Sequence, residues 1–270
     1  MQHSPMTLRA AAGPLLGLLL PLAATAQAEP AAATPAPAVA PAGDEVGKLL
    51  AEVDGAWPDR DAPGRFEEIK AKLDAAEKLA PSAYGVLWRI SRWYWWAGDD
   101  AKLPEEERSR LGKLGWDYGD KAVQADPSKV EGWFYASAGV GDYSLAMGVV
   151  TALLKGMESK YTDRLSKAEQ IDAKFDSGAI DTSWGRYFYE LPWPKYDPSK
   201  SEIRYQMALG RNKANVRARV YLAELYLKEN HPKEARKQLE KAIAEPPGGY
   251  DPAEERRYQA VARELLAKMK

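Results

Sequence analysis

The chain has 270 residues, with 38 basic and 39 acidic side chains, a formal net charge of −1 and no cysteine. This balance argues against nucleic acid or anionic lipid as the main partner, because either would favour a clustered basic face. Without cysteine, neither disulfides nor thiol chemistry is available. Beyond residue 28 the only histidine is His231, so the usual zinc sites and histidine-dependent nucleophiles are excluded, and we expect no metal and no cofactor.

The first 28 residues have the pattern of an export signal. Arg9 precedes an apolar run over residues 10–22, and small residues then follow in A-x-A spacing at Ala24, Ala26 and Ala28. We expect cleavage after Ala28 or Ala26 and a periplasmic location, without a lipid anchor because the cysteine that would carry one is missing. Residues 29–43 are almost entirely alanine and proline and are predicted to form an extended linker.

A short signature recurs through the rest of the chain. An alanine late in an amphipathic segment is followed five positions later by proline or its substitute, at Ala76/Pro81, Ala122/Pro127, Ala168/Ala173, Ala208/Lys213 and Ala242/Pro247. The alanines are 46, 46, 40 and 34 residues apart, so a 34-residue unit recurs with insertions. Such periods indicate a helical solenoid. We therefore predict an all-α array of enlarged helical hairpins over residues 44–250.

The last unit is the clearest. Its residues follow the order of a tetratricopeptide repeat, which has two adjacent packing residues, an aromatic residue, a turn, and then a small, a large and a small residue. These positions are occupied by Leu222, Ala223, Tyr226, Asn230, Ala235, Leu239, Ala242 and Pro247. Small side chains at Ala223 and Ala235 allow two antiparallel helices to approach closely. This match specifies a tetratricopeptide-like repeat.

Three further segments are predicted from local signals. The apolar run 148–154 is expected to be a helix buried against a neighbour. Residues 191–198 hold three prolines and are expected to form a long loop between two helices. Residues 251–270 are expected to form a capping helix, with Asp251 as N-cap, Pro252 at the first position and an apolar stripe at Tyr258, Val261, Leu265 and Leu266.

Residues 45–247 resemble a known family of exported repeat proteins. The segments 87–94 and 185–192 and the enlarged repeats between them are similar to the T component of TRAP transporters (TatT-like), which are uptake systems that depend on a solute-binding protein. The layout is also similar to that of the regulator of microtubule dynamics family, although an export signal argues against a microtubule role. The resemblance to T components implies a periplasmic subunit that docks on a solute-binding protein or transporter subunit and binds or passes a small, partly hydrophobic ligand. Together with the arginines described next, it leads us to expect a small amphipathic or acidic ligand.

Aromatic residues are crowded into a few segments, including residues 93–96 and 184–189. One interpretation is that these rings fill wide gaps between enlarged repeats. The other is a concave pocket in which aromatic walls supply contact area and arginines anchor an acidic group. The second interpretation predicts a ligand-binding or partner-binding surface at Trp88, Arg89, Arg92, Trp95, Trp133, Arg186, Tyr187 and Tyr189.

No motif for catalysis stands out, and we expect no enzymatic activity. The fragment Gly139-Val-Gly141-Asp142 lacks the preceding strand and third glycine of a dinucleotide loop and is interpreted as a helix turn. The sequence therefore predicts a non-catalytic scaffold, and the resemblance to T components implies that it accompanies a transporter. Two alternatives stay open: a general scaffold for envelope assembly, and a glycan-acting enzyme, which would need two carboxylates that converge in a cleft.

Overall fold

The computed structural model describes residues 42–100, 102–246 and 248–269. The predicted signal peptide, the linker as far as residue 41 and Pro247 of the last signature lie outside these ranges. No strand occurs among the described residues.

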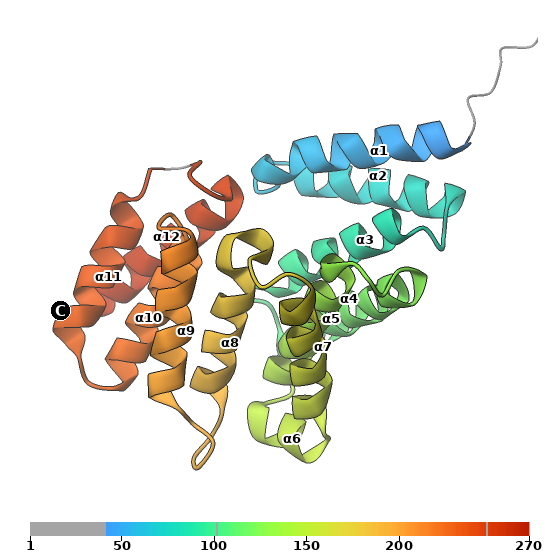
Figure 1. The fold of residues 1–270 in the computed structure, drawn as a ribbon. Helices are drawn as coiled ribbons and strands as arrows, with labels where there is room; N and C mark the ends of the chain where they lie inside the picture. Colours follow the sequence, from blue (N-terminus) through green and yellow to red (C-terminus); the bar gives the residue numbers. More distant parts are fainter. Residues whose placement is uncertain (1–41, 101, 247, 270) are drawn as a thin grey trace, which may run out of the picture. The chain divides into compact units, whose positions relative to one another are not determined.

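The described chain forms five antiparallel helical hairpins followed by one more helix (Figure 1). The paired helices are α1 (Ala42–Ala56) with α2 (Arg65–Leu79), α3 (Tyr84–Gly98) with α4 (Glu105–Ala125), α5 (Val130–Ala146) with α7 (Met157–Ile171), α8 (Ala179–Glu190) with α9 (Pro198–Arg211), and α10 (Val216–Lys228) with α11 (Pro232–Ala244). The last helix is α12 (Pro252–Lys268), and three short elements are η1 (Trp57–Asp59), α6 (Val149–Leu154) and η2 (Phe175–Gly178). The predicted all-α solenoid of enlarged hairpins is confirmed.

The alanine signature marks the point where the second helix of each hairpin packs against its neighbours. All five alanines are fully buried, at Ala76, Ala122, Ala168, Ala208 and Ala242. In the first four hairpins the alanine carbonyl also accepts the hydrogen bond from the residue that ends the helix. The alanine therefore serves two needs, a close helix contact and a defined helix end.

Other small residues are required by close contacts between paired helices. Ala223 and Ala235 are fully buried in the last hairpin. In the fourth hairpin, a Cβ atom on Gly185 would come within 2.5 Å of the Tyr205 ring. The predicted spacing of small and large residues thus follows from how close the helices are.

The inserted segment 148–154 is only partly as predicted. It does form a short helix, α6, and Ala152 is buried. However, Val150 is 60% exposed and Leu154 is 86% exposed, so the expected burial of the whole segment is wrong. The helix covers one apolar cluster with one face and leaves its other face in solvent.

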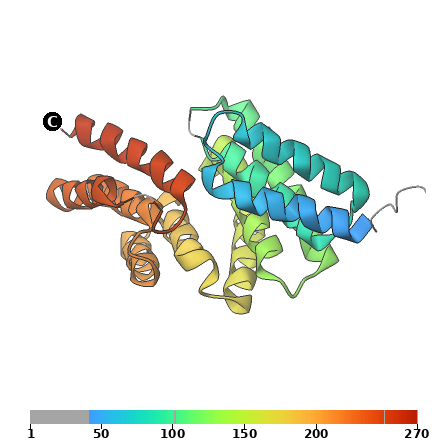
Figure 2. The ribbon, with the colours of Figure 1, turned by 90° about the horizontal axis from the view of Figure 1, so that it is seen from above.

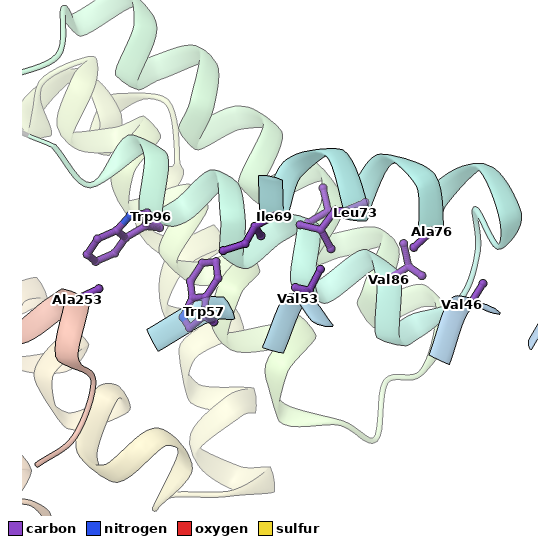
Figure 3. Close-up of a cluster of buried hydrophobic side chains, with 10 residues drawn as sticks. Val46, Val53, Trp57, Ile69, Leu73, Ala76, Val86, Trp96 and Ala253 are labelled. Carbon is purple, nitrogen blue, oxygen red and sulfur yellow. The ribbon is translucent and has the colours of Figure 1, made fainter. Parts of the chain in front are cut away.

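Helix α12 begins as predicted, because the Asp251 side chain accepts a hydrogen bond from the backbone N–H of Glu254 and Pro252 follows the cap. Tyr258 is buried against the last hairpin, and Val261, Leu265 and Leu266 pack there partly buried. The opposite end of the helix has a second contact that the sequence did not indicate. Ala253 belongs to the core of the first hairpin, beside Trp57 and Trp96 (Figure 3).

Helix α12 therefore joins the last hairpin to the first. Figures 1 and 2 both show the start of α12 beside the end of α1. Arg60, which follows η1, is 1% exposed and donates to Asp251 over 2.8 Å. Arg256 of α12 pairs with Asp61 at 2.6 Å. Instead of ending freely, the array closes on itself.

Candidate functional site

A cavity with two adjoining lobes lies between α12 and the second to fifth hairpins. The lobes have volumes of about 460 Å³ and 320 Å³. Trp95, Asp176, Tyr250 and Glu254 line both lobes. The residues come from α3, η2, the segment before α12, and α12 itself. We call this space the central cavity, and its size is in the usual range for a small-molecule site.

The smaller lobe has mostly aromatic walls. Six rings line it, from Trp57, Trp88, Trp95, Tyr135, Phe175 and Tyr250. Several of them pack on one another: Trp88 stacks on Tyr135 at 6.0 Å, and Tyr135 meets Phe175 edge-on at 6.4 Å. Such packing fixes the orientation of the walls before any ligand enters.

The larger lobe has a more polar lining, in which charged side chains join α3, α10 and α12. Arg217 of α10 is 9% exposed and pairs with Asp99 at 2.7 Å and with Glu254 at 2.9 Å. The Tyr258 hydroxyl lies 2.7 Å from that of Tyr221 and also donates to Asp99. These contacts hold the C-terminal part of the array against the end of α3.

Four carboxylates of the cavity, Asp100, Glu131, Asp142 and Asp176, make no ion pair with any described residue. Asp100 and Glu131 accept hydrogen bonds, from the Lys102 backbone N–H and from the Tyr84 hydroxyl. Asp142 is 7% exposed, and its Oδ2 atom has no hydrogen-bond partner. Asp176 lies in η2 with φ 46°, in the left-handed region that aspartate tolerates better than most residues. Asp176 is exposed and lines both lobes of the cavity. Strained backbone of this kind is common at binding sites.

Burial raises the pKa of several carboxyl groups here. It raises the pKa of Glu254 to about 7, against the opposing effect of Arg217. Burial also raises the pKa of Asp176. For Asp142, burial and the neighbouring Asp99 carboxylate raise the pKa well above its usual range. Each of these groups therefore keeps its proton to a higher pH than a solvated carboxyl group does.

Four of the eight residues predicted for the site line the central cavity. Trp88, Arg92 and Trp95 line the smaller lobe, and Trp95 and Arg186 line the larger one. Arg92 stacks on Trp57 at 4.0 Å and pairs with Asp54 at 3.0 Å. The structure thus brings the aromatic residues of α3 together with rings of α5, η2 and the segment before α12.

The other four lie elsewhere. Arg89 pairs with Asp54, whose pKa the two arginines of α3 lower although burial opposes them. Trp133 donates its ring N–H to the Pro127 carbonyl at 2.9 Å, and the Tyr187 hydroxyl donates to Glu158 at 2.8 Å. Tyr189 packs against Arg186 at 4.7 Å. None of the four lines the central cavity.

The predicted arginine anchors already have carboxylate partners within the protein. Arg89 and Arg92 share Asp54, and Arg186 pairs with Glu190 at 2.6 Å and with Glu224. An acidic ligand would have to compete with these pairs. Sequence reasoning missed Asp142 and Asp176, which have no ion pair among the described residues. One signal was present, because Asp142 is the only charged residue between Glu131 and Lys155.

The described residues offer no evident metal site or membrane span. No group of three or more histidine or acidic side chains in the described ranges is placed to hold a metal ion. Likewise, none of the described helices is both long enough and apolar enough to cross a membrane.

Comparison with known proteins identifies the fold. No family model and no curated protein sequence matches the chain. Among solved structures, the chain is similar to TTC0263, a thermophilic TPR protein of Thermus thermophilus, with TM-score 0.60 and 22% identity over 82% of this chain and 100% of that one. It is also similar to PilF of Pseudomonas aeruginosa, with TM-score 0.52 and 14% identity over 84% of this chain and 93% of that one. The chain therefore has a TPR-like fold.

Proposed function

We propose that this protein is a non-catalytic TPR-type scaffold that holds a small ligand in its central cavity and docks on protein subunits of a TRAP-type solute uptake system in the periplasm. The observation that carries the proposal is the closed array around a preformed cavity. An open solenoid presents a concave surface to a large partner. Here α12 covers part of that surface and leaves a partly open cavity of a size that suits a small molecule.

Docking on a partner needs a different surface, and one apolar end of the molecule is suitable. Leu154 of α6 is 86% exposed, and Trp193 in the loop between α8 and α9 is 87% exposed. An ion pair between Lys195 and Glu158, at 2.5 Å, connects that loop to the start of α7. Exposed large apolar side chains from two neighbouring segments are typical of a protein contact, and tryptophan is a favoured anchor.

The transport assignment is supported by the resemblance of residues 45–247 to T components. We would test it by photo-cross-linking in the native envelope, with p-benzoylphenylalanine in place of Trp193. The expected result is a cross-link to a solute-binding protein or transporter subunit, identified by mass spectrometry. A matched probe in place of the exposed Lys237 of α11 should give no such product. Identical products from both positions, or only unrelated envelope proteins from Trp193, would favour a general assembly scaffold.

A glycan-acting enzyme is the second candidate, and one observation favours it. Asp99 and Asp142 both line the larger lobe, and burial with the nearby Asp99 keeps the pKa of Asp142 high, as a general acid requires. Against this, Arg217 and Tyr258 already hold the Asp99 carboxylate. Hydrolysis of nitrophenyl glycosides that is lost in Asp142→Asn would establish this activity and overturn the non-catalytic proposal.

A further inference from the structure

The ligand class can be inferred from the walls of the central cavity. Around it, guanidinium groups already stack on ring faces: Arg92 on Trp57 at 4.0 Å, Arg217 on Trp95 at 4.8 Å and Arg257 on Trp96 at 3.3 Å. Cations are attracted to these faces by the ring quadrupole, and the attraction grows when both groups are removed from water. The rings that line the smaller lobe offer the same chemistry to a bound cation.

The charged side chains of the smaller lobe also favour a bound cation. Its lining holds four carboxylates, Glu131, Asp176, Asp251 and Glu254, and a single cation, Arg92. Arg92 is paired with Asp54, which lies outside the lining. Asp251 and Glu254 also have arginine partners, Arg60 and Arg217. Glu131 and Asp176 have no ion pair among the described residues, and Glu131 only accepts a hydrogen bond from the Tyr84 hydroxyl, so negative charge is left to be balanced.

The larger lobe adds an independent observation. Asp142 is more than nine-tenths buried, and its Oδ2 atom has no hydrogen-bond partner. A buried carboxylate without a partner is costly for the fold. Arg108, Arg217 and Arg257 also line this lobe and favour the ionised carboxylate, but burial and Asp99 outweigh them and raise the pKa of Asp142. A ligand that supplies a further positive charge would remove the remaining cost.

We propose that the central cavity binds an organic cation of the alkylammonium or quaternary ammonium class, with Asp176 and Asp142 as its counter-charges and the rings of Trp95, Tyr135, Phe175 and Tyr250 around its head group. This inference rests on the proposed function, in which the cavity holds a small ligand, and it names the class of that ligand. An acidic ligand fits less well, because the arginines predicted to anchor it are already neutralised by Asp54, Glu190 and Glu224. An aromatic wall also suits an organic cation better than a metal ion, which needs several oxygen ligands.

The test compares three probes of known charge on the full chain by isothermal titration calorimetry at pH 8. Choline is the cation, 3,3-dimethylbutan-1-ol is its uncharged isostere, and hexanoate is the anion. Choline should bind at least about tenfold more tightly than the isostere, and hexanoate should not bind measurably. If the isostere or hexanoate binds as tightly as choline, the cation class is overturned while ligand binding stands. If none of the three binds, the cation class is likewise overturned, and the cross-linking experiment still decides the docking function separately.

Substitutions then place the binding site. Asp176→Asn keeps a side chain that also tolerates the left-handed backbone, and it should weaken choline binding at least about tenfold. Asp142→Asn should weaken it similarly. Asp163→Asn, on the exposed face of α7, is the matched control and should leave binding unchanged. Helical circular dichroism and the melting temperature confirm that each variant is folded. Wild-type affinity in both cavity variants would overturn the placement.

Discussion

The Arg60 guanidinium and the Asp251 carboxylate meet at 2.8 Å, although 191 residues separate them in the chain. Arg60 also stacks on Trp57 at 4.5 Å and on Trp96 at 3.7 Å. It is almost fully buried, so the pair with Asp251 is its main compensation. This pair fixes the first hairpin to the start of α12 and so forms one side of the central cavity.

Arg60→Ala should therefore lower the free energy of unfolding by about 3 kcal/mol, because it leaves the Asp251 carboxylate without its cation and removes two stacked contacts. Urea denaturation followed by circular dichroism measures the change. Arg65→Ala is the control, since its pair with Glu68 is exposed, and it should cost less than about 1 kcal/mol. Equal midpoints for the two variants would show that closure contributes nothing to stability.

Ala235→Leu should destabilise the last hairpin by about 1 to 3 kcal/mol, because Ala235 is fully buried at the contact between α10 and α11. Lys237→Leu, on the exposed face of α11, should change stability by less than about 0.5 kcal/mol. Thermal unfolding of both variants provides the comparison. A loss in Lys237→Leu as large as that in Ala235→Leu would contradict the packing described for this hairpin.

The pH dependence of stability should reflect Glu254. Its pKa in the folded protein is about 7, above that of an unfolded glutamate, so the folded state binds more protons between those two values. The free energy of unfolding should therefore fall as pH rises from about 4.5 to 7, by about 1 to 3 kcal/mol for this group. The raised pKa values of Asp142 and Asp176 act in the same direction.

Urea titrations at pH 5.0, 6.0, 7.0 and 8.0 would measure this slope. Glu254→Gln should make it shallower, because the side chain no longer titrates while Arg217, Arg60, Asp251 and Asp176 still surround it. The carboxyl groups whose pKa is lowered, such as Asp54 and Asp61, lose their contribution only at lower pH. A wild-type slope in Glu254→Gln would exclude Glu254 as its source.

Asp142→Asn should stabilise the ligand-free protein by about 1 to 3 kcal/mol, because it removes a buried carboxylate with no partner. A gain in melting temperature at pH 8 would be the observation. The control Asp163→Asn should stay within about 0.5 kcal/mol of wild type. Destabilisation by Asp142→Asn would instead mean that the ionised carboxylate is needed for folding.

Much of the fold is encoded locally and was predictable. The alanine signature indicates one buried position in each hairpin, and Asp251 followed by Pro252 indicates the capped start of a helix. Both patterns can be recognised within a few residues of sequence. The closure was not predictable. Arg60 and Asp251 belong to no repeat position, and a charged residue in an amphipathic helix is usually solvated. For the same reason, the sequence did not show that Arg89, Arg92 and Arg186 already have carboxylate partners.

Only half of the candidate site was predictable, because some of its residues are positioned by contacts that no local sequence pattern shows. Aromatic crowding on α3 does indicate a cavity wall at Trp88 and Trp95. Asp176, in contrast, owes its position to a left-handed backbone turn, and no local pattern distinguishes it from the other aspartates of the chain. A lone charge inside an apolar helix, as at Asp142, was the one readable sign of the polar lobe.

The contact between the first hairpin and α12 also limits how this protein can change in length. An open tetratricopeptide array gains or loses a repeat while its remaining interfaces stay as they were. In this chain, an added or deleted hairpin would carry Asp251 away from Arg60, and Ala253 away from Trp57 and Trp96. The number of hairpins is therefore set by the geometry of closure, and variation in this protein should occur as loop and helix extensions, such as α6, rather than as whole repeats.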